Sequence, residues 1–137
     1  MTSIVTYEGD LRTNCTHIRS QSTIETDAPI DNNGKGERFS PTDILATSLA
    51  SCMITVMGIK ARSLGFDLND VKIEVEKIMK AEPRRVGRIN LTFHIPDPLK
   101  NLDDKQKHIL KHTGDTCPVM KSIHPDIDVQ VDWGHWA

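Results

Sequence analysis

Aromatic residues, an excess charge of either sign and a secretion signal are all scarce or missing in this chain of 137 residues. It has only two Trp, one Tyr and three Phe, so its core must consist mainly of aliphatic and Met side chains. The net charge of -2 gives no reason to expect nucleic acid or an anionic membrane as a partner. The N-terminus has no basic segment followed by an apolar run, which predicts that no signal peptide is present.

Cysteine is also rare. The chain has three, an odd number, and without a secretion signal this indicates reduced thiols and a cytoplasmic location. The run Gly34-Lys35-Gly36 precedes a predicted helix but lacks the other residues of a phosphate-binding loop. No internal repeat or low-complexity segment divides the sequence, so residues 1–137 are expected to form a single domain.

The longest uncharged apolar stretch predicts a helix over residues 41–64, about 24 residues and roughly 36 Å long. Ser40 suits the N-cap, Pro41 suits the first helical position, and Asp43 is a shorter relative of the capping-box Glu. Gly65 is a natural left-handed stop. The middle of this helix has no charge and only small hydroxyls as polar groups, which predicts burial on all sides in a protein core instead of a membrane.

Alternating apolar and polar residues predict strands on both sides of this helix. The predicted strands cover residues 2–7, 11–18, 71–80, 86–95 and 127–133, with a short additional strand over 22–26. Two further helices are predicted, from 102 to about 113 and over 117–123. This order is not the strand–helix alternation of a parallel sheet, so we predict the α+β class with antiparallel sheets.

Two of the cysteines are candidate nucleophiles. Cys117 lies at the start of a short predicted helix, where unpaired N–H groups and the positive end of the dipole favour a thiolate. Cys52 lies in the middle of the long helix, where a thiolate needs a neighbouring cation or donor. From the residues alone Cys117 is the better candidate, but free cysteines are often buried and inert, and this alternative applies to all three. We interpret Cys15, which lies on an alternating strand, as such an inert cysteine.

His108 and His112 stand four residues apart on a predicted helix, a spacing that allows two side chains to share a metal ion. No Glu lies between them in the pattern of the zinc proteases, and no third ligand is evident. Several lysines surround them. We therefore interpret this pair as part of a solvated helix face and predict no metal site.

Two cysteine motifs of the sequence resemble those of the OsmC/Ohr family of thiol proteins. The first is Gly34-x-Gly36-Glu37-x-Phe39-Ser40-Pro41-Thr42-Asp43-Ile44-Leu45-x-x-Ser48-Leu49-Ala50-Ser51-Cys52, which is similar to the family's central-helix motif. The second is Thr116-Cys117-Pro118-Val119. The spacing of about 65 residues between the two cysteines also fits. The resemblance covers nearly the whole chain and is closer to the general OsmC-like branch than to the best-characterised organic hydroperoxide reductases.

This resemblance implies an intertwined homodimer, in which sheets wrap around two long central helices, one from each subunit. Two active sites would lie at the subunit interface, and the all-round apolarity of the helix would reflect burial between subunits. The resemblance implies no metal and no organic cofactor. The expected partners are a hydroperoxide substrate, a dithiol reductant and the second subunit.

The activity that the resemblance implies is thiol-dependent reduction of organic hydroperoxides, in defence against oxidative and osmotic stress. Cys52 would be the peroxidatic thiol, which becomes a sulfenic acid, and Cys117 the resolving thiol, which condenses with it to a disulfide. Arg12 matches an arginine that favours the ionised thiol. The family's hydroperoxide reductases hold this arginine with a Glu near the helix start. Here Thr42 and Asp43 occupy that segment, and Asp43 is the candidate for orienting Arg12.

Two other readings remain open. One is a non-peroxidase protein of the same fold that binds a small apolar molecule or senses redox state at the dimer interface. The other is a structural dimer without chemistry. Reaction of the reduced protein with an organic hydroperoxide distinguishes them, because only a peroxidase loses two thiols quickly to one disulfide.

Overall fold

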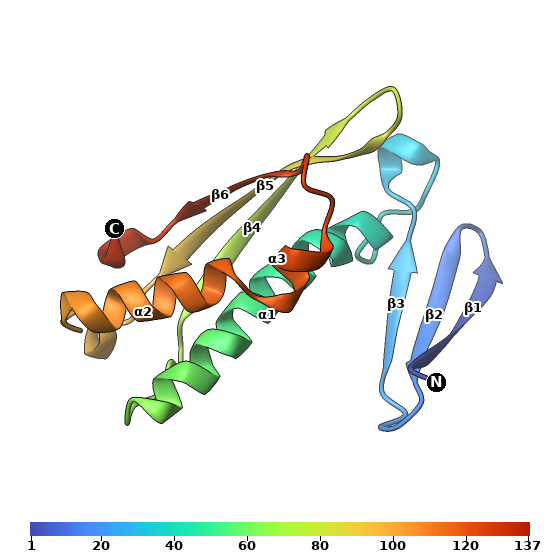
Figure 1. Cartoon of the computed structure of the whole chain (residues 1–137). Helices are drawn as coiled ribbons and strands as arrows, with labels where there is room; N and C mark the ends of the chain where they lie inside the picture. Colours follow the sequence, from blue (N-terminus) through green and yellow to red (C-terminus); the bar gives the residue numbers. More distant parts are fainter. The chain divides into compact units, whose positions relative to one another are not determined.

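Two three-stranded sheets and one long helix form the framework of the chain, which confirms the α+β prediction (Figure 1). The computed structural model describes residues 1–137. Contacts along the chain define two units, Met1–Leu45 and Ala46–Ala137, with the boundary inside the first turns of the long helix. Each unit is described by itself below.

The first unit is built on an antiparallel sheet of three consecutive strands: β1 (Ser3–Gly9), β2 (Arg12–His17) and β3 (Thr23–Asp27). The predicted short third strand is therefore confirmed. The turn between β1 and β2 is formed by Asp10 and Leu11, both with positive φ, at 53° and 63°.

The loop between β3 and the long helix folds back on β3. The backbone N–H of Asp27 donates to the carbonyl of Phe39 at 3.1 Å, and that of Gly36 donates to the carbonyl of Ala28 at 3.2 Å. A single 3-10 turn, η1 (Ile30–Asn32), lies within the loop. These bonds return the chain to the end of β3 before the helix begins.

The start and the end of the long helix α1 (Pro41–Ser63) are as predicted. The Ser40 hydroxyl accepts from the backbone N–H of Asp43 at 3.1 Å, and the Asp43 carboxylate accepts from the backbone N–H of Ser40 at 2.9 Å. This reciprocal pair is a capping box that satisfies two of the unpaired donors at the helix start. Gly65 follows the helix with a φ of +96°.

Burial of α1 on all sides, by contrast, is not found in the single chain. The buried residues form one stripe, consisting of Ala46, Leu49, Ala50, Met53, Met57 and Ala61. Ile59, on the other side, is 66% exposed. By length and composition alone α1 could cross a membrane, and 33% of its apolar window is buried within the chain. The outer side of the helix is thus uncovered within the single chain, whereas the resemblance implies that a second subunit covers it.

The second unit contains a mixed sheet of β4 (Lys72–Lys80), β5 (Arg85–His94) and β6 (Asp128–Asp132). The predicted antiparallel pairing of β4 and β5 is confirmed, and the inward residues of β5 are buried as expected: Ile89, Leu91 and Phe93. However, β6 runs parallel to β5, so the prediction of antiparallel sheets is wrong for this pair. The reason is that the chain crosses back through two helices and enters β6 at the same end as β5.

Those two helices are α2 (Asp104–Asp115) and α3 (Pro118–Ser122), and α2 lies on the same side of the sheet as α1 (Figure 1). The sequence predicts that this helix ends at about residue 113. The helix instead continues through Gly114, which is buried. A Cβ atom at Gly114 would lie 2.8 Å from Sδ of Met57. The glycine therefore serves the close approach of α2 to α1 and does not end the helix.

This close contact predicts a loss of stability when Gly114 is enlarged. Gly114→Val is expected to lower the free energy of unfolding by about 2 kcal/mol, because the added side chain must displace Met57 in a packed core. Gly58→Ala is the matched control: nothing lies within 4 Å of its Cβ position in α1. That variant is expected to gain about 0.5–1 kcal/mol from helix propensity. Urea denaturation measures both, and equal effects of the two changes would contradict the close-contact interpretation.

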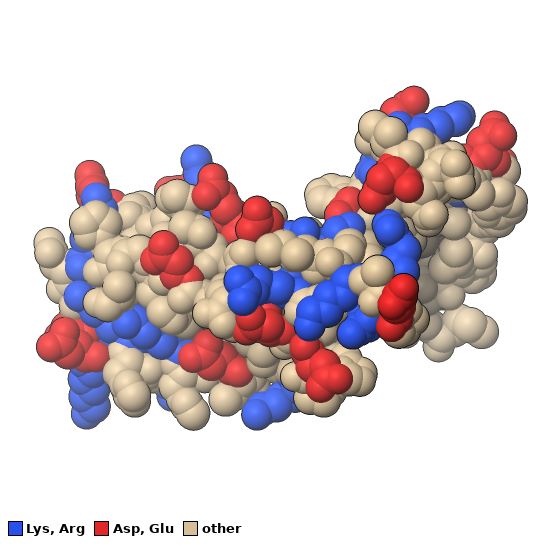
Figure 2. Space-filling model, turned by 90° about the horizontal axis from the view of Figure 1, so that it is seen from above, with Lys and Arg blue, Asp and Glu red and all other residues tan.

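Acidic and basic side chains are interspersed on the face of the molecule seen in Figure 2. No broad patch of one sign covers this face, in keeping with the small net charge of -2.

Candidate thiol active site

Two thiols meet in the second unit. Cys52 lies in the middle of α1 and is half-buried, whereas Cys117 precedes α3 and is only 1% exposed. The two side chains lie close enough together for Cys52 to raise the pKa of Cys117. Neighbouring thiols are the starting arrangement that formation of a disulfide requires. The structure thus brings together the two cysteines that the sequence places 65 residues apart.

Cys117 itself is the N-cap of α3. Its sulfur accepts a hydrogen bond from the backbone N–H of Met120 at 3.4 Å. Pro118 follows at the first helical position, where its missing N–H leaves no donor unsatisfied. The cap fixes the sulfur at the start of the short helix.

Burial raises the pKa of the Cys117 thiol above its ordinary value. The N–H of Met120 acts in the opposite direction, while the contact with Cys52 raises the pKa further. The prediction that a helix terminus lowers this pKa is therefore wrong, because removal from water outweighs the backbone donors of Val119 and Met120 at a five-residue helix. At neutral pH Cys117 keeps its proton, which it can donate to the sulfur of Cys52.

The raised pKa of Cys117 predicts that stability falls at high pH. Below the ordinary pKa of 9.0, the thiol is protonated in both the folded and the unfolded chain, and its contribution is complete. Above that pH the unfolded chain loses the proton first, so the free energy of unfolding falls, by at most about 1.4 kcal/mol per pH unit. The fall ends once pH exceeds the pKa in the folded state.

Urea denaturation of the reduced protein at a series of pH values measures this fall. The difference between wild type and Cys117→Ala isolates the Cys117 contribution from that of lysines and tyrosine. Cys15→Ser should retain the wild-type profile. Parallel profiles for wild type and Cys117→Ala would show that burial does not raise the pKa of the Cys117 thiol.

In the first unit, Arg12 forms a bidentate ion pair with Asp27. Arg12 is the first residue of β2 and lies opposite Asp27, the last residue of β3. Nε of Arg12 donates to Oδ1 of Asp27 at 2.7 Å, and Nη2 donates to Oδ2 at 2.8 Å. Nη2 also donates to Oε2 of Glu37 at 3.3 Å. The arginine is thus held by two carboxylates, one of them fully buried.

Hydrogen bonds keep both Arg12 and Asp27 in their charged forms. The two donors of Arg12 hold the pKa of Asp27 below its ordinary value of 3.8, and the backbone N–H of Glu37 also donates to this carboxylate, at 3.1 Å. The same contacts raise the pKa of Arg12. Because the Arg12 side chain is 21% exposed, part of the fixed guanidinium remains accessible.

Asp27 and Glu37 are partners of Arg12 that the sequence analysis does not single out. Asp27 stands at the predicted start of a loop, and only the register of β2 on β3 places it beside Arg12. Glu37 lies within the quoted cysteine motif, which is the one signal that points to it. Asp43, the residue that the sequence proposes for this role, accepts from the backbone N–H of Ser40 in the capping box.

The remaining candidates from the sequence lie elsewhere. Cys15 is half-buried on β2, with its sulfur 3.8 Å from Oγ1 of Thr13. His108 and His112 are exposed on α2. No group of three or more His, Cys, Asp or Glu side chains is arranged to hold a metal ion.

The candidate site is a cysteine pair on an α+β framework, with one cysteine in the middle of a long helix and the other at the start of a short one. The family profile described as OsmC-like protein matches residues 34–132. The chain therefore belongs to the OsmC-like family, and the predicted resemblance is confirmed.

Solved structures agree with this assignment. A protein from Psychrobacter arcticus 273-4, named a candidate osmotic stress induced and detoxification response protein, is 54% identical, with a TM-score of 0.91 over 96% of this chain and 94% of that one. An organic hydroperoxide resistance protein OsmC from Legionella pneumophila is 20% identical, with a TM-score of 0.72 over 96% of each chain.

The organic hydroperoxide resistance protein OhrB of Bacillus subtilis is 18% identical, with a TM-score of 0.64 over 96% of this chain and 97% of that one. At these low identities the two hydroperoxide resistance proteins show a shared fold. No curated protein sequence matches the chain significantly.

Proposed function

We propose that this protein is a cytoplasmic thiol-dependent peroxidase that reduces organic hydroperoxides and contributes to defence against oxidative and osmotic stress. The observation that carries the proposal is the contact between the thiols of Cys52 and Cys117. The names of proteins with the same fold support it, because the Legionella and Bacillus proteins are named for organic hydroperoxide resistance.

In the proposed reaction, the thiolate of Cys52 attacks the terminal oxygen of the hydroperoxide. The O–O bond breaks, the alkoxide takes a proton from water and leaves as the alcohol, and Cys52 becomes a sulfenic acid. The sulfur of Cys117 then attacks the sulfur of Cys52, which forms the disulfide and releases water. A dithiol reductant supplies two electrons by thiol–disulfide exchange, restores both thiols and becomes a disulfide itself.

The division of roles between the thiols follows from their surroundings. Cys117 is fully buried and its pKa is raised, so its thiol stays protonated at neutral pH and is less suited than Cys52 to the first attack on the peroxide. Cys52 is the more exposed of the two. In our proposal Arg12 supplies the cation that favours the Cys52 thiolate, with Asp27 and Glu37 as the groups that orient it and Asp43 as a further candidate.

We further propose that the protein acts as a homodimer. Val5, Tyr7 and Ile24 share one face of the first sheet and are 62%, 64% and 55% exposed. Ile59, on the outer side of α1, is similarly exposed. Apolar side chains gathered in this way are typical of a surface that another chain covers. A second copy of this chain is the expected partner.

Brief treatment of the reduced protein with cumene hydroperoxide tests the proposed function. Two of the three thiols should disappear, and mass spectrometry of the digested protein should find one intramolecular disulfide between Cys52 and Cys117. Cys15→Ser should behave as wild type. Oxidation no faster than that of free cysteine, or a disulfide that includes Cys15, would contradict the proposal and favour a binding or redox-sensing protein.

A further inference from the structure

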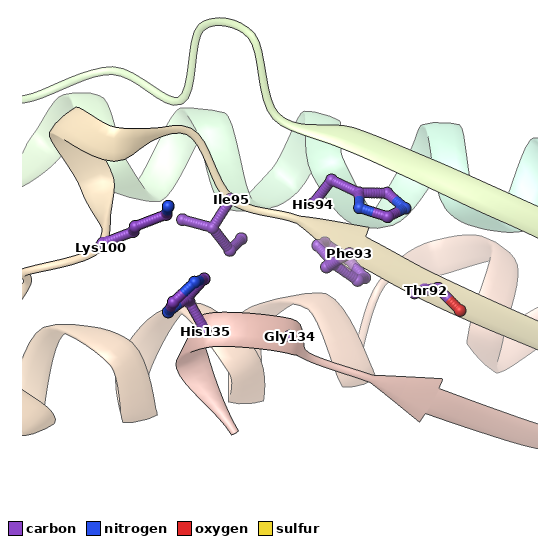
Figure 3. Close-up of a pocket in the computed structure, with 7 residues that line it drawn as sticks. All are labelled: Thr92, Phe93, His94, Ile95, Lys100, Gly134 and His135. Carbon is purple, nitrogen blue, oxygen red and sulfur yellow. The ribbon is translucent and has the colours of Figure 1, made fainter.

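A pocket of about 500 Å³ lies in the second unit, at the edge of β5 beyond the point where β6 ends. Its lining comes from three places: residues 92–95 at the end of β5, Lys100 after the 3-10 turn η2 (Asp97–Leu99), and the first two residues of η3 (Gly134–Trp136). Figure 3 shows these side chains. The volume falls within the range of small-ligand sites.

The frame of this pocket is firmly fixed. The indole N–H of Trp136, a residue only 1% exposed, donates to the carbonyl of Leu99 at 2.9 Å and so ties η3 to η2. Gly134 has a φ of +58°, and a Cβ atom there would lie 2.4 Å from the carbonyl oxygen of Phe93. The rings of Phe93 and Trp133 pack with centroids 4.6 Å apart. The backbone that frames the pocket is therefore held in place by contacts within the chain.

Basic groups from three separate elements line this fixed frame: His94, Lys100 and His135. In Figure 3 Lys100 and His135 both lie beside Ile95, while His94 lies farther along β5, near Phe93. Lys100 and His135 come from separate elements and lie at the same end of a partly apolar pocket, an arrangement typical of a site for a small anion.

Two carboxylates at the rim of the pocket form ion pairs with two of these basic side chains. Oδ1 of Asp97 lies 2.6 Å from Nζ of Lys100, and Oε2 of Glu74 lies 3.1 Å from Nε2 of His94. Both carboxylates are highly exposed, at 90% and 76%. Exposed pairs of this kind contribute little free energy and are easily exchanged. An external oxyanion can therefore take the place of Asp97 on Lys100.

We propose that this pocket binds a small oxyanion, a carboxylate or phosphate group, between Lys100 and His135. The site is separate from the thiol pair, and the proposal does not depend on the peroxidase function. It assigns a ligand class to residues that the thiol chemistry does not use.

Titration of the folded, ¹⁵N-labelled protein with sodium benzoate, and separately with sodium phosphate, tests this proposal against a sodium chloride titration of equal ionic strength. Saturable amide shifts at residues 93–95, 100, 134 and 135 are expected with at least one of the two oxyanions. Saturation by benzoate alone indicates a carboxylate ligand, and saturation by phosphate alone indicates a phosphate ligand. Shifts that never saturate, or that match the chloride titration, would overturn the proposal.

Variants of Lys100 and of its carboxylate partner Asp97 provide a second test. Lys100→Gln should weaken binding about tenfold, because a charge-assisted hydrogen bond is lost, and Lys100→Arg should restore most of it. Asp97→Asn should tighten binding, because the competing carboxylate is removed. Lys105→Gln, an exposed change on α2, is the matched control and should have no effect. Equal weakening by Lys100→Gln and Lys105→Gln would indicate a general charge effect and overturn the proposal.

Discussion

Replacing Cys52 by serine is expected to abolish the reduction of organic hydroperoxides. A hydroxyl cannot form a sulfenic acid, so the rate of peroxide consumption should fall by about a thousandfold or more. The measurement is the steady-state consumption of cumene hydroperoxide in the presence of a dithiol reductant. Cys15→Ser is the matched control and should retain the wild-type rate. Substantial turnover by Cys52→Ser would contradict the assignment of Cys52 as the attacking thiol.

Cys117→Ser provides the complementary result. This variant should still react with about one equivalent of hydroperoxide, because the attacking thiol is intact, but it should not form the internal disulfide. The sulfenic acid of Cys52 should accumulate and be trapped as a dimedone adduct that mass spectrometry locates. If Cys117→Ser loses the first reaction while Cys52→Ser keeps it, the two roles are reversed, as the residues alone suggest.

The second large effect is expected at Asp27. Asp27→Asn keeps the size of the side chain but removes the charge that holds Arg12 through two hydrogen bonds, of 2.7 and 2.8 Å. In our proposal a misplaced Arg12 stabilises the Cys52 thiolate less. The second-order rate constant for oxidation of Cys52 should therefore fall by about ten- to a hundredfold, the equivalent of one lost charge-assisted hydrogen bond. Stopped-flow oxidation of the reduced protein measures it.

Two neighbouring carboxylates serve as controls for Asp27. Glu25 approaches Nε of Arg12 only to 3.9 Å, so Glu25→Gln should leave the rate nearly unchanged. Asp43→Asn removes the capping carboxylate of α1 and should affect stability more than rate. If Asp43→Asn slows oxidation as much as Asp27→Asn does, Asp43 also orients Arg12. A fold check by circular dichroism separates a lost function from a lost structure.

Local sequence patterns account for most of the elements. The alternation in residues 71–80 and 86–95 predicts the β4–β5 hairpin, because one of its faces is buried and the other is solvated. The capping pair of Ser40 and Asp43 predicts the start of α1, because both groups belong to one helical turn. Cys52 and Cys117 can be identified from the resemblance, but their contact depends on the packing of α1 against the chain around α3.

Features that depend on distant parts of the chain could not be predicted in this way. The parallel direction of β6 follows from where α2 and α3 deliver the chain, and the partnership of Arg12 with Asp27 follows from strand register. The raised pKa of Cys117 follows from burial by residues far away in the sequence. Gly114 resembles a helix stop in sequence, and only its contact with Met57 explains its place inside α2.

The parallel pairing of β6 also has a consequence for folding. Arg88 on β5 and its ion-pair partner Asp128 on β6 are 40 residues apart, whereas β4 and β5 join through a short hairpin. Closing the longer loop costs more chain entropy, so the hairpin should form early and β6 should join late. Cys117 lies within that loop. A newly made chain thus carries two separate thiols, and they meet only when the chain between β5 and β6 packs against α1.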